Sequence, residues 1–157
     1  MSEDIQCNLG ENLIQSIRDK DSQRAITLLD EGANVNQKES GAMTNPSVLI
    51  LASRFGLTDV VARLLKGGAN PNIADDWGGT PLSASSEGGY NDITLLLLNA
   101  GADVNSQGAG GQTPLMMACI YGRTEIVKLL LAHGADLGIR ERYEIGSTRA
   151  SGDLYNA

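Results

Sequence analysis

The chain has 157 residues, which is the size of one domain, and its formal net charge at pH 7 is -7. This negative charge disfavours nucleic acids and anionic membrane surfaces as partners. No segment has the apolar run that a membrane span needs, and the acidic residues 1–4 do not begin a signal peptide. We therefore expect an intracellular protein, cytoplasmic or nuclear, that binds neither nucleic acid nor membrane.

Composition also restricts the core and the state of the cysteines. Hydrophobic residues make up 41% of the chain but aromatic residues only 4%, so the core must consist of aliphatic side chains. The two cysteines, Cys7 and Cys119, are far apart in the sequence, and we expect both to be reduced thiols in a reducing compartment. We expect Cys119 to occupy a packed position on a helix, where a small residue usually stands.

In chain order, residues 1–10 are expected to be a flexible or loosely docked lead-in. Residues 11–37 then contain two apolar helical stripes, the first with Leu13 and Ile17 and the second with Leu28. The outward positions of this unit are charged, which suits the first unit of a stack because one of its sides has no neighbour. The sequence therefore predicts an N-terminal capping unit.

The loop after this first unit is longer than the later loops. Fifteen residues separate Gly32 from Ser47, whereas twelve separate Gly68 from Thr80. The three additional residues fall within 37–46. Two interpretations stay open, since the insertion either belongs to a binding surface or is tolerated in a surface loop.

The clearest helix signals lie in residues 73–105. Thr80 can cap the first helix with its side chain, and Pro81 fits the first helical position because it has no N–H to satisfy. Asn91 or Asp92 can cap the second helix. Each helix has one apolar stripe and nothing within the unit to cover it, so neighbouring units must supply that surface.

The same pattern recurs with a period of 33 residues. Thr80–Leu82 reappears as Thr113–Leu115, and Gly68–Ala69 reappears as Gly101–Ala102 and again as Gly134–Ala135. A fixed period of this length is typical of a solenoid, in which similar helix pairs stack side by side. The sequence therefore predicts an all-α repeat solenoid with repeats at about 11–37, 38–72, 73–105 and 106–137.

The repeated motif resembles the ankyrin repeat, whose pattern is roughly D-x-x-G-x-T-P-L-x-x-A-A-x-x-G, then I-V-x-x-L-L, then G-A-D-V-N. The copy in 73–105 matches this pattern at Asp75, Gly78, Thr80, Pro81, Leu82, Gly89, Ile93, Leu97, Leu98, Gly101, Ala102, Asp103, Val104 and Asn105. The copy in 106–137 matches it at Gly111, Thr113, Pro114, Leu115, Ala118, Gly122, Ile126, Val127, Leu130, Leu131, Gly134, Ala135 and Asp136. The resemblance covers residues 11–137. It implies about four helix–turn–helix pairs joined by β-hairpin loops in an L-shaped stack.

The resemblance also implies a function. Proteins similar to this one hold protein partners with the tips of the hairpin loops and with the exposed, concave side of the first helices. We therefore expect a non-catalytic adaptor that binds a protein partner, acts as a monomer and needs no cofactor. The corresponding positions in this chain give the candidate binding residues Arg54, Phe55, Asp76, Trp77, Glu87, Gln112, Met116, Ile120 and Tyr121.

Three aromatic residues fall at positions that the repeat pattern does not need. Trp77 is the only tryptophan and lies at a loop tip, whereas Phe55, the only phenylalanine, and Tyr121 hold the same position two repeats apart. Exposed aromatic residues are enriched at protein interfaces because they bury a large area at a small entropic cost. Trp77 is therefore the favoured interface residue. Phe55 and Tyr121 either join that interface or pack against the neighbouring repeat.

The sequence offers no convincing catalytic or metal site. His133 ends a helix, where a cation is favourable and where ankyrin repeats often have histidine, so a structural role is the better interpretation. A thiol enzyme or small-ligand site around Cys119 and His133 is the alternative from another class, but no third residue is placed to orient the histidine. Two cysteines and one histidine without a C-x-x-C motif do not make a zinc site.

Two further alternatives concern the same fold. One is a regulatory inhibitor that masks the active surface of its partner, and the other is a structural module within a longer protein. Residues 138–157 retain only a trace of the repeat at Gly146–Thr148. This segment is expected to be a degenerate fifth repeat, a C-terminal cap or a tail.

Overall fold

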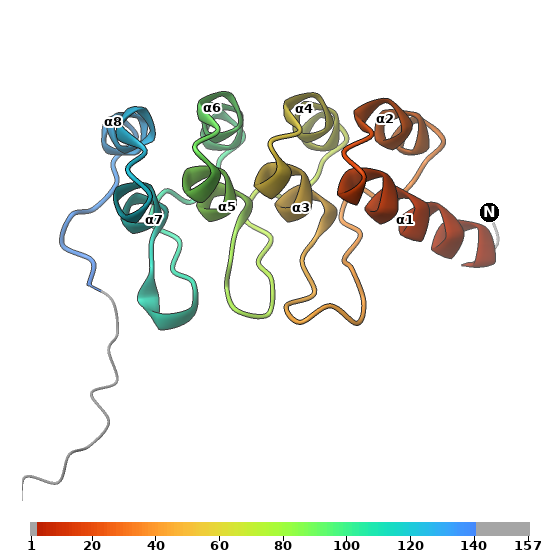
Figure 1. The fold of residues 1–157 in the computed structure, drawn as a ribbon, viewed down its shortest axis with the longest axis horizontal. Coiled ribbons are helices and arrows are strands. Elements are labelled where there is room, and N and C mark those ends of the chain that lie inside the picture. Colours follow the sequence, from red (N-terminus) through yellow and green to blue (C-terminus); the bar gives the residue numbers. More distant parts are fainter. Residues whose placement is uncertain (1–2, 141–157) are drawn as a thin grey trace, which may run out of the picture.

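The chain folds into a row of helix pairs with loops extending from one side (Figure 1). The structure is a computed structural model, and it describes residues 3–140. Each predicted repeat contains one pair of helices, so the predicted all-α repeat solenoid is confirmed. The helices are α1 (Glu3–Arg18), α2 (Ser22–Asp30), α3 (Val48–Phe55), α4 (Thr58–Lys66), α5 (Pro81–Gly88), α6 (Asn91–Asn99), α7 (Pro114–Ile120) and α8 (Thr124–Ala132), with the short 3-10 turn η1 (Ala109–Gly111) before α7. The prediction for residues 141–157 lies outside the described residues.

The helices form two rows. Helices α1, α3, α5 and α7 form the row next to the loops, and α2, α4, α6 and α8 form the row away from them (Figure 1). Neighbours within a row contact one another, as α3 contacts α5, α5 contacts α7 and α4 contacts α6. We call the three loops the first finger (residues 33–47), the second finger (69–80) and the third finger (102–113). The fingers and the exposed side of the first row together form what we call the inner surface.

The fingers are hairpin-shaped but contain little β-pairing. Among residues 3–140, the only β-bridge joins Lys38 to Ser47 in the first finger. The second finger is closed near its tip by the Asp75 N–H, which donates to the Gly79 carbonyl at 2.9 Å. A β-ladder needs a longer series of such bonds. The predicted β-hairpins are therefore present as tight turns without strands.

The first helix is longer than the sequence predicted. Helix α1 begins at Glu3, so residues 3–10, which were expected to form a lead-in before the first repeat, are helical. Leu13 and Ile17 are fully buried, and Leu9, one turn earlier, packs against the same core. Residues four apart share one face of a helix, so this apolar stripe continues the helix toward the N-terminus.

A side-chain cap begins α5 as predicted. The Thr80 hydroxyl accepts a hydrogen bond from the main chain of α5 at 3.2 Å, and Pro81 occupies the first turn. The prediction that Asn91 or Asp92 caps α6 is wrong, because the N-cap residue is Tyr90, which makes no capping bond with its side chain. The Tyr90 ring lies between Gly56 of the preceding repeat and Gly88 of its own repeat.

A row of asparagine side chains ties neighbouring repeats together. The Asn72 side-chain oxygen accepts a hydrogen bond from the Asp103 N–H at 2.7 Å, and the Asn105 oxygen accepts one from the Asp136 N–H at 2.8 Å. Each bond joins a loop to the next loop of the stack, about one period further along the chain. The residue one period after Asn105 is Gly138, which has no side chain to continue the row.

The core is aliphatic, as the composition predicted. It runs through the stack as one cluster, with contributions from every helix pair. Burial of this apolar surface between repeats is the main stabilising contribution to a solenoid. The largest fully buried side chains are Leu13, Ile17, Val48, Leu49, Ile50, Leu51, Leu64, Leu82, Ile93, Leu97, Ile126 and Leu130.

Ser53 in α3 is fully buried, and its hydroxyl has no hydrogen-bond partner among the described atoms. The hydroxyl of Ser86, one repeat later, donates to the Leu82 carbonyl at 2.7 Å. We expect Ser53→Ala to raise the free energy of unfolding by about 1 kcal/mol, because it removes a buried polar group that gains no bond on folding. Urea unfolding followed by circular dichroism measures this change. Ser86→Ala is the matched control, and equal stability of the two variants would contradict the prediction.

Candidate protein-binding site

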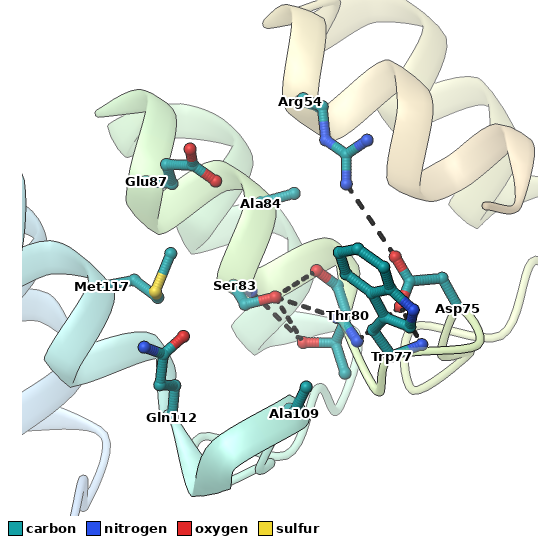
Figure 2. Close-up of a pocket in the computed structure, with 12 residues that line it drawn as sticks. Arg54, Asp75, Trp77, Thr80, Ser83, Ala84, Glu87, Ala109, Gln112 and Met117 are labelled. Atoms are coloured by element: carbon teal, nitrogen blue, oxygen red, sulfur yellow. Dashed lines mark hydrogen bonds and ion pairs between the residues drawn. The ribbon is translucent and has the colours of Figure 1, made fainter. Parts of the chain in front are cut away.

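A pocket lies where the loop-side helices meet the fingers (Figure 2). Its volume is about 180 Å³, and it is bounded by α3, α5 and α7 and by the tips of the second and third fingers. It therefore belongs to the inner surface. The residues that line it are Arg54, Asp75, Trp77, Gly79, Thr80, Ser83, Ala84, Glu87, Gly108, Ala109, Gln112 and Met117.

Trp77 forms the exposed wall of this pocket. Its side chain is 56% exposed, although its main chain is held firmly in the turn of the second finger. The buried carboxylate of Asp75 accepts hydrogen bonds from the Trp77 N–H at 3.0 Å and from the Gly79 N–H at 2.7 Å. A Cβ atom on Gly79 would lie 2.9 Å from the same carboxylate, so a larger residue there would have to displace Asp75. The indole is thus exposed on a fixed support.

The finger tips are bonded to one another as well. The Ala109 N–H of the third finger donates to the Trp77 carbonyl at 2.6 Å, and the Asp76 N–H of the second finger donates to the Thr44 carbonyl of the first at 2.9 Å. The Asn45 side-chain amide also donates to the Asp76 carboxylate at 2.7 Å. All three fingers therefore form one connected row, which fixes the position of Trp77 relative to the helices.

The charged groups of the pocket come from α3, the second finger and α5. The Arg54 guanidinium lies 3.9 Å from the Asp75 carboxylate, so these two charges largely offset each other. The Tyr121 phenol of the next repeat lies beside the Glu87 carboxylate. The negative charge of Glu87, and secondly hydrogen bonding to it, raise the pKa of the Tyr121 phenol above its usual value of 10.0.

The family model described as ankyrin repeats (3 copies) matches the chain at residues 13–108 and again at 49–141. The two matches together include all three fingers and most of the chain. The chain belongs to the ankyrin repeat family. Ankyrin repeats generally act as protein–protein interaction modules. No curated protein shows significant similarity to this chain. Within residues 3–140, no helix has the length and apolar character needed to cross a membrane.

The ankyrin fold brings about half of the predicted binding residues to one place. Arg54, Trp77, Glu87 and Gln112 line the pocket, and Tyr121 lies beside it through its bond to Glu87. Tyr121 is 46% exposed, so it remains accessible to a partner while it touches Glu87. These five residues come from three repeats, and only the stacking of the helices makes them neighbours.

The other predicted residues lie outside the pocket. Asp76 is exposed but its carboxylate is bonded within the row of fingers. Phe55 is half-buried against the core, and the Lys20 ammonium lies 5.9 Å from the centre of its ring. Met116 is half-buried, whereas Ile120 is 61% exposed at the end of α7. A binding role for these residues stays a prediction.

Two methionines are part of the inner surface although the sequence did not single them out. Met117, rather than Met116, lines the pocket, because helix phase turns the later residue toward the third finger. Met43 is 83% exposed on the first finger, within the insertion at 37–46. An apolar residue inside an otherwise polar insertion was the signal that could have identified it.

The expectation that Cys119 is packed is wrong, because its side chain is exposed. Ser53 and Ser86 hold the same position in earlier ankyrin repeats and are fully buried, since the next repeat covers them. No described helix covers α7 on that side. His133 lies at the end of α8, where its ring Nδ1 is 2.8 Å from the Leu129 carbonyl of the same helix. This contact supports the structural interpretation of the histidine.

The contact between Glu87 and Tyr121 makes a testable prediction for the ankyrin surface. We expect Glu87→Gln to lower the pKa of the Tyr121 phenol toward 10.0, because the neutral amide no longer opposes the phenolate. A raised pKa favours the protonated phenol in the folded state. The stabilisation by this contact is therefore present below pH 10 and lost as pH rises through the folded-state pKa. NMR titration of tyrosine ring carbons measures the shift, and Tyr90 is the internal control. An unchanged Tyr121 pKa in Glu87→Gln would contradict this prediction.

Proposed function

We propose that this ankyrin repeat protein is a non-catalytic adaptor that binds a protein partner on its inner surface, with Trp77 as the central contact. The observation that carries the proposal is the exposed indole beside a pocket that helices and fingers build together. Tryptophan is among the residues most enriched at the energetic centre of protein interfaces. The repeat pattern itself does not need a tryptophan at this position.

The rigidity of the surface supports the same proposal. The main chain on both sides of the indole is fixed by the Asp75 carboxylate and by the bond from Ala109. A surface that is ordered before binding loses little conformational entropy when a partner docks. Exposed Ile120, Tyr121 and Met43 extend the apolar character of the inner surface on either side of the pocket.

The proposal also includes a monomeric, intracellular protein without a cofactor. The described part of the chain has no cluster of three or more histidine, cysteine or acidic residues arranged to hold a metal ion. The exposed Cys119 has no acid or base placed beside it by any described contact. These observations favour binding over thiol chemistry as the use of this fold.

Capture from cell lysate tests the proposed function. We expect Trp77→Ala to weaken capture of the partner at least about thirtyfold, which corresponds to about 2 kcal/mol, because the indole is the largest exposed apolar group at the pocket. Leu95→Ala is the matched control, since Leu95 is also partly exposed but lies on α6 in the other row. Circular dichroism and thermal unfolding must show that both variants fold.

Trp77 also reports directly on the bound state. It is the only tryptophan, so its fluorescence should change when the captured partner is added to the unmodified protein. Equal capture by the wild type and Trp77→Ala, together with unchanged tryptophan fluorescence, would contradict the proposed function.

A further inference from the structure

The pocket combines apolar walls with a carboxylate. The Trp77 indole lies on one side and the Met117 side chain on the other, Ala84 also lines the pocket, and Glu87 stands one helical turn beyond Ser83 on α5 (Figure 2). Residues four apart lie on the same face of a helix, and Glu87 lines the same opening as these walls. A side chain that fits here needs an apolar stem and a polar end.

The charges around the opening favour a positive end. Two carboxylates, those of Asp75 and Glu87, and one guanidinium, that of Arg54, line the opening. Asp75 already offsets Arg54 at 3.9 Å, whereas the group beside Glu87 is the uncharged phenol of Tyr121. The lining therefore carries one excess negative charge, that of Glu87.

Glu87 retains the capacity to accept another donor. An ionised carboxylate has about four lone-pair positions, more than the single phenol of Tyr121 beside it can use. The nearby Arg123 guanidinium donates to the main-chain carbonyl of Glu87 at 3.0 Å, and Arg123 does not line the pocket. The carboxylate side of the opening is thus suited to a cation that enters from outside.

We propose that this pocket receives an arginine or lysine side chain from a basic segment of the protein partner. This inference rests on the proposed function and names the chemistry of the partner. The aliphatic stem lies against Trp77 and Met117, and the cation lies near the indole face and the Glu87 carboxylate. The net charge of -7 favours approach of a basic segment over long range.

Synthetic peptide pools test the inference without knowledge of the partner. Each pool consists of fluorescein-labelled nonapeptides with one fixed central residue, namely arginine, lysine, leucine or glutamate, and with randomised uncharged residues on both sides. Fluorescence anisotropy gives the affinity of each pool for the full chain. Quenching of the single tryptophan shows whether the peptide occupies the Trp77 pocket.

We expect the arginine and lysine pools to bind about tenfold more tightly than the leucine pool, and the glutamate pool to bind most weakly. Glu87→Gln should remove most of this preference, and Trp77→Ala should weaken the arginine and lysine pools about tenfold. Glu125→Gln on α8 makes the same change in net charge away from the pocket and should preserve the preference. High salt should reduce the preference, because it screens the exposed charges.

Three results would overturn the inference. If the glutamate pool binds most tightly and Arg54→Gln removes that affinity, the pocket is a site for an acidic partner. Equal binding of the leucine and arginine pools with no effect of Glu87→Gln would show an apolar occupant. Failure of every pool to bind at about 1 mM would show that no single basic side chain is recognised. In each case the proposed function would still hold if Trp77→Ala weakens capture of the partner from lysate. If Trp77→Ala does not weaken capture, both the proposed function and this inference are wrong.

Discussion

Replacing Leu97 with alanine should lower the free energy of unfolding by about 2–5 kcal/mol. Leu97 is fully buried in α6, the second helix of an internal repeat, and belongs to the continuous aliphatic core. Truncation removes apolar contacts and leaves a cavity that helices fixed on both sides, α4 and α8, cannot easily fill. Urea unfolding followed by circular dichroism measures the loss.

Leu130→Ala separates the effect of position in the stack from the effect of the lost side chain. Leu130 holds the same place one repeat later and is also fully buried, but α8 has a described neighbour on one side only. Solenoid stability is approximately a sum of repeat terms and nearest-neighbour terms. Leu130→Ala should therefore open mainly repeat 106–137, with faster amide hydrogen exchange confined there. Leu97→Ala should speed amide hydrogen exchange in the repeats on both sides of α6. The same exchange pattern in both variants would contradict this account.

Repeat number and helix positions could be predicted from the sequence because they depend on local signals. Thr80 and Pro81 specify a helix start through bonds within one turn, and the 33-residue period shows which elements stack. The start of α1 could not be placed in this way. Its first residues have no repeat counterpart, and the stripe through Leu9 is only an extension of the one that contains Leu13.

Burial was harder to predict than helix position. Ser53, Ser86 and Cys119 are equivalent in the repeat pattern, yet the first two are buried and Cys119 is exposed. The difference comes from the neighbouring repeat. The repeat that follows each serine covers it, whereas the structure describes no helix after α8 that could cover Cys119. Pattern alone gives the position within a repeat, while burial depends on the neighbour.

The candidate site was predictable in part for the same reason. Exposure of Trp77 followed from the fact that no repeat position needs a tryptophan at a finger tip. The roles of Asp75 and Asp76 did not follow, because hydrogen bonds to Gly79 and Asn45 depend on how the fingers fold and align. A single sequence shows that an acidic residue is present but not which donors surround it.

The alignment of α3 and α5 determines the shape of the pocket, since these helices carry Arg54 and Glu87. Gly56 ends α3 with a left-handed backbone, and a Cβ atom there would lie 2.5 Å from the Tyr90 ring. A Cβ atom on Gly88 would clash with another edge of the same ring. The Tyr90 ring therefore occupies the space that the missing side chains of these two glycines leave.

We expect Gly56→Ala to lower the free energy of unfolding by roughly 2–5 kcal/mol. About 1–2 kcal/mol comes from the left-handed backbone and about 1–3 kcal/mol from overpacking against Tyr90. Gly122→Ala is the matched control, because Gly122 has the same backbone conformation and no described atom near its missing Cβ. Chemical unfolding of both variants should show that Gly122→Ala lowers the free energy of unfolding only by the backbone contribution of about 1–2 kcal/mol.

Removing the Tyr90 ring tests directly whether a clash with it makes Gly56→Ala destabilising. If the clash with Tyr90 is responsible, Gly56→Ala should cost less in a Tyr90→Ala background than in the wild type, with a coupling of about 1–3 kcal/mol. Equal costs in the two backgrounds would assign the whole effect to the backbone. A shifted α3 also displaces Arg54 from Asp75, so folded Gly56→Ala protein should bind its partner more weakly even though Gly56 does not line the pocket. Full binding by that variant would show that the pocket tolerates movement between repeats, and that the finger row alone positions Trp77.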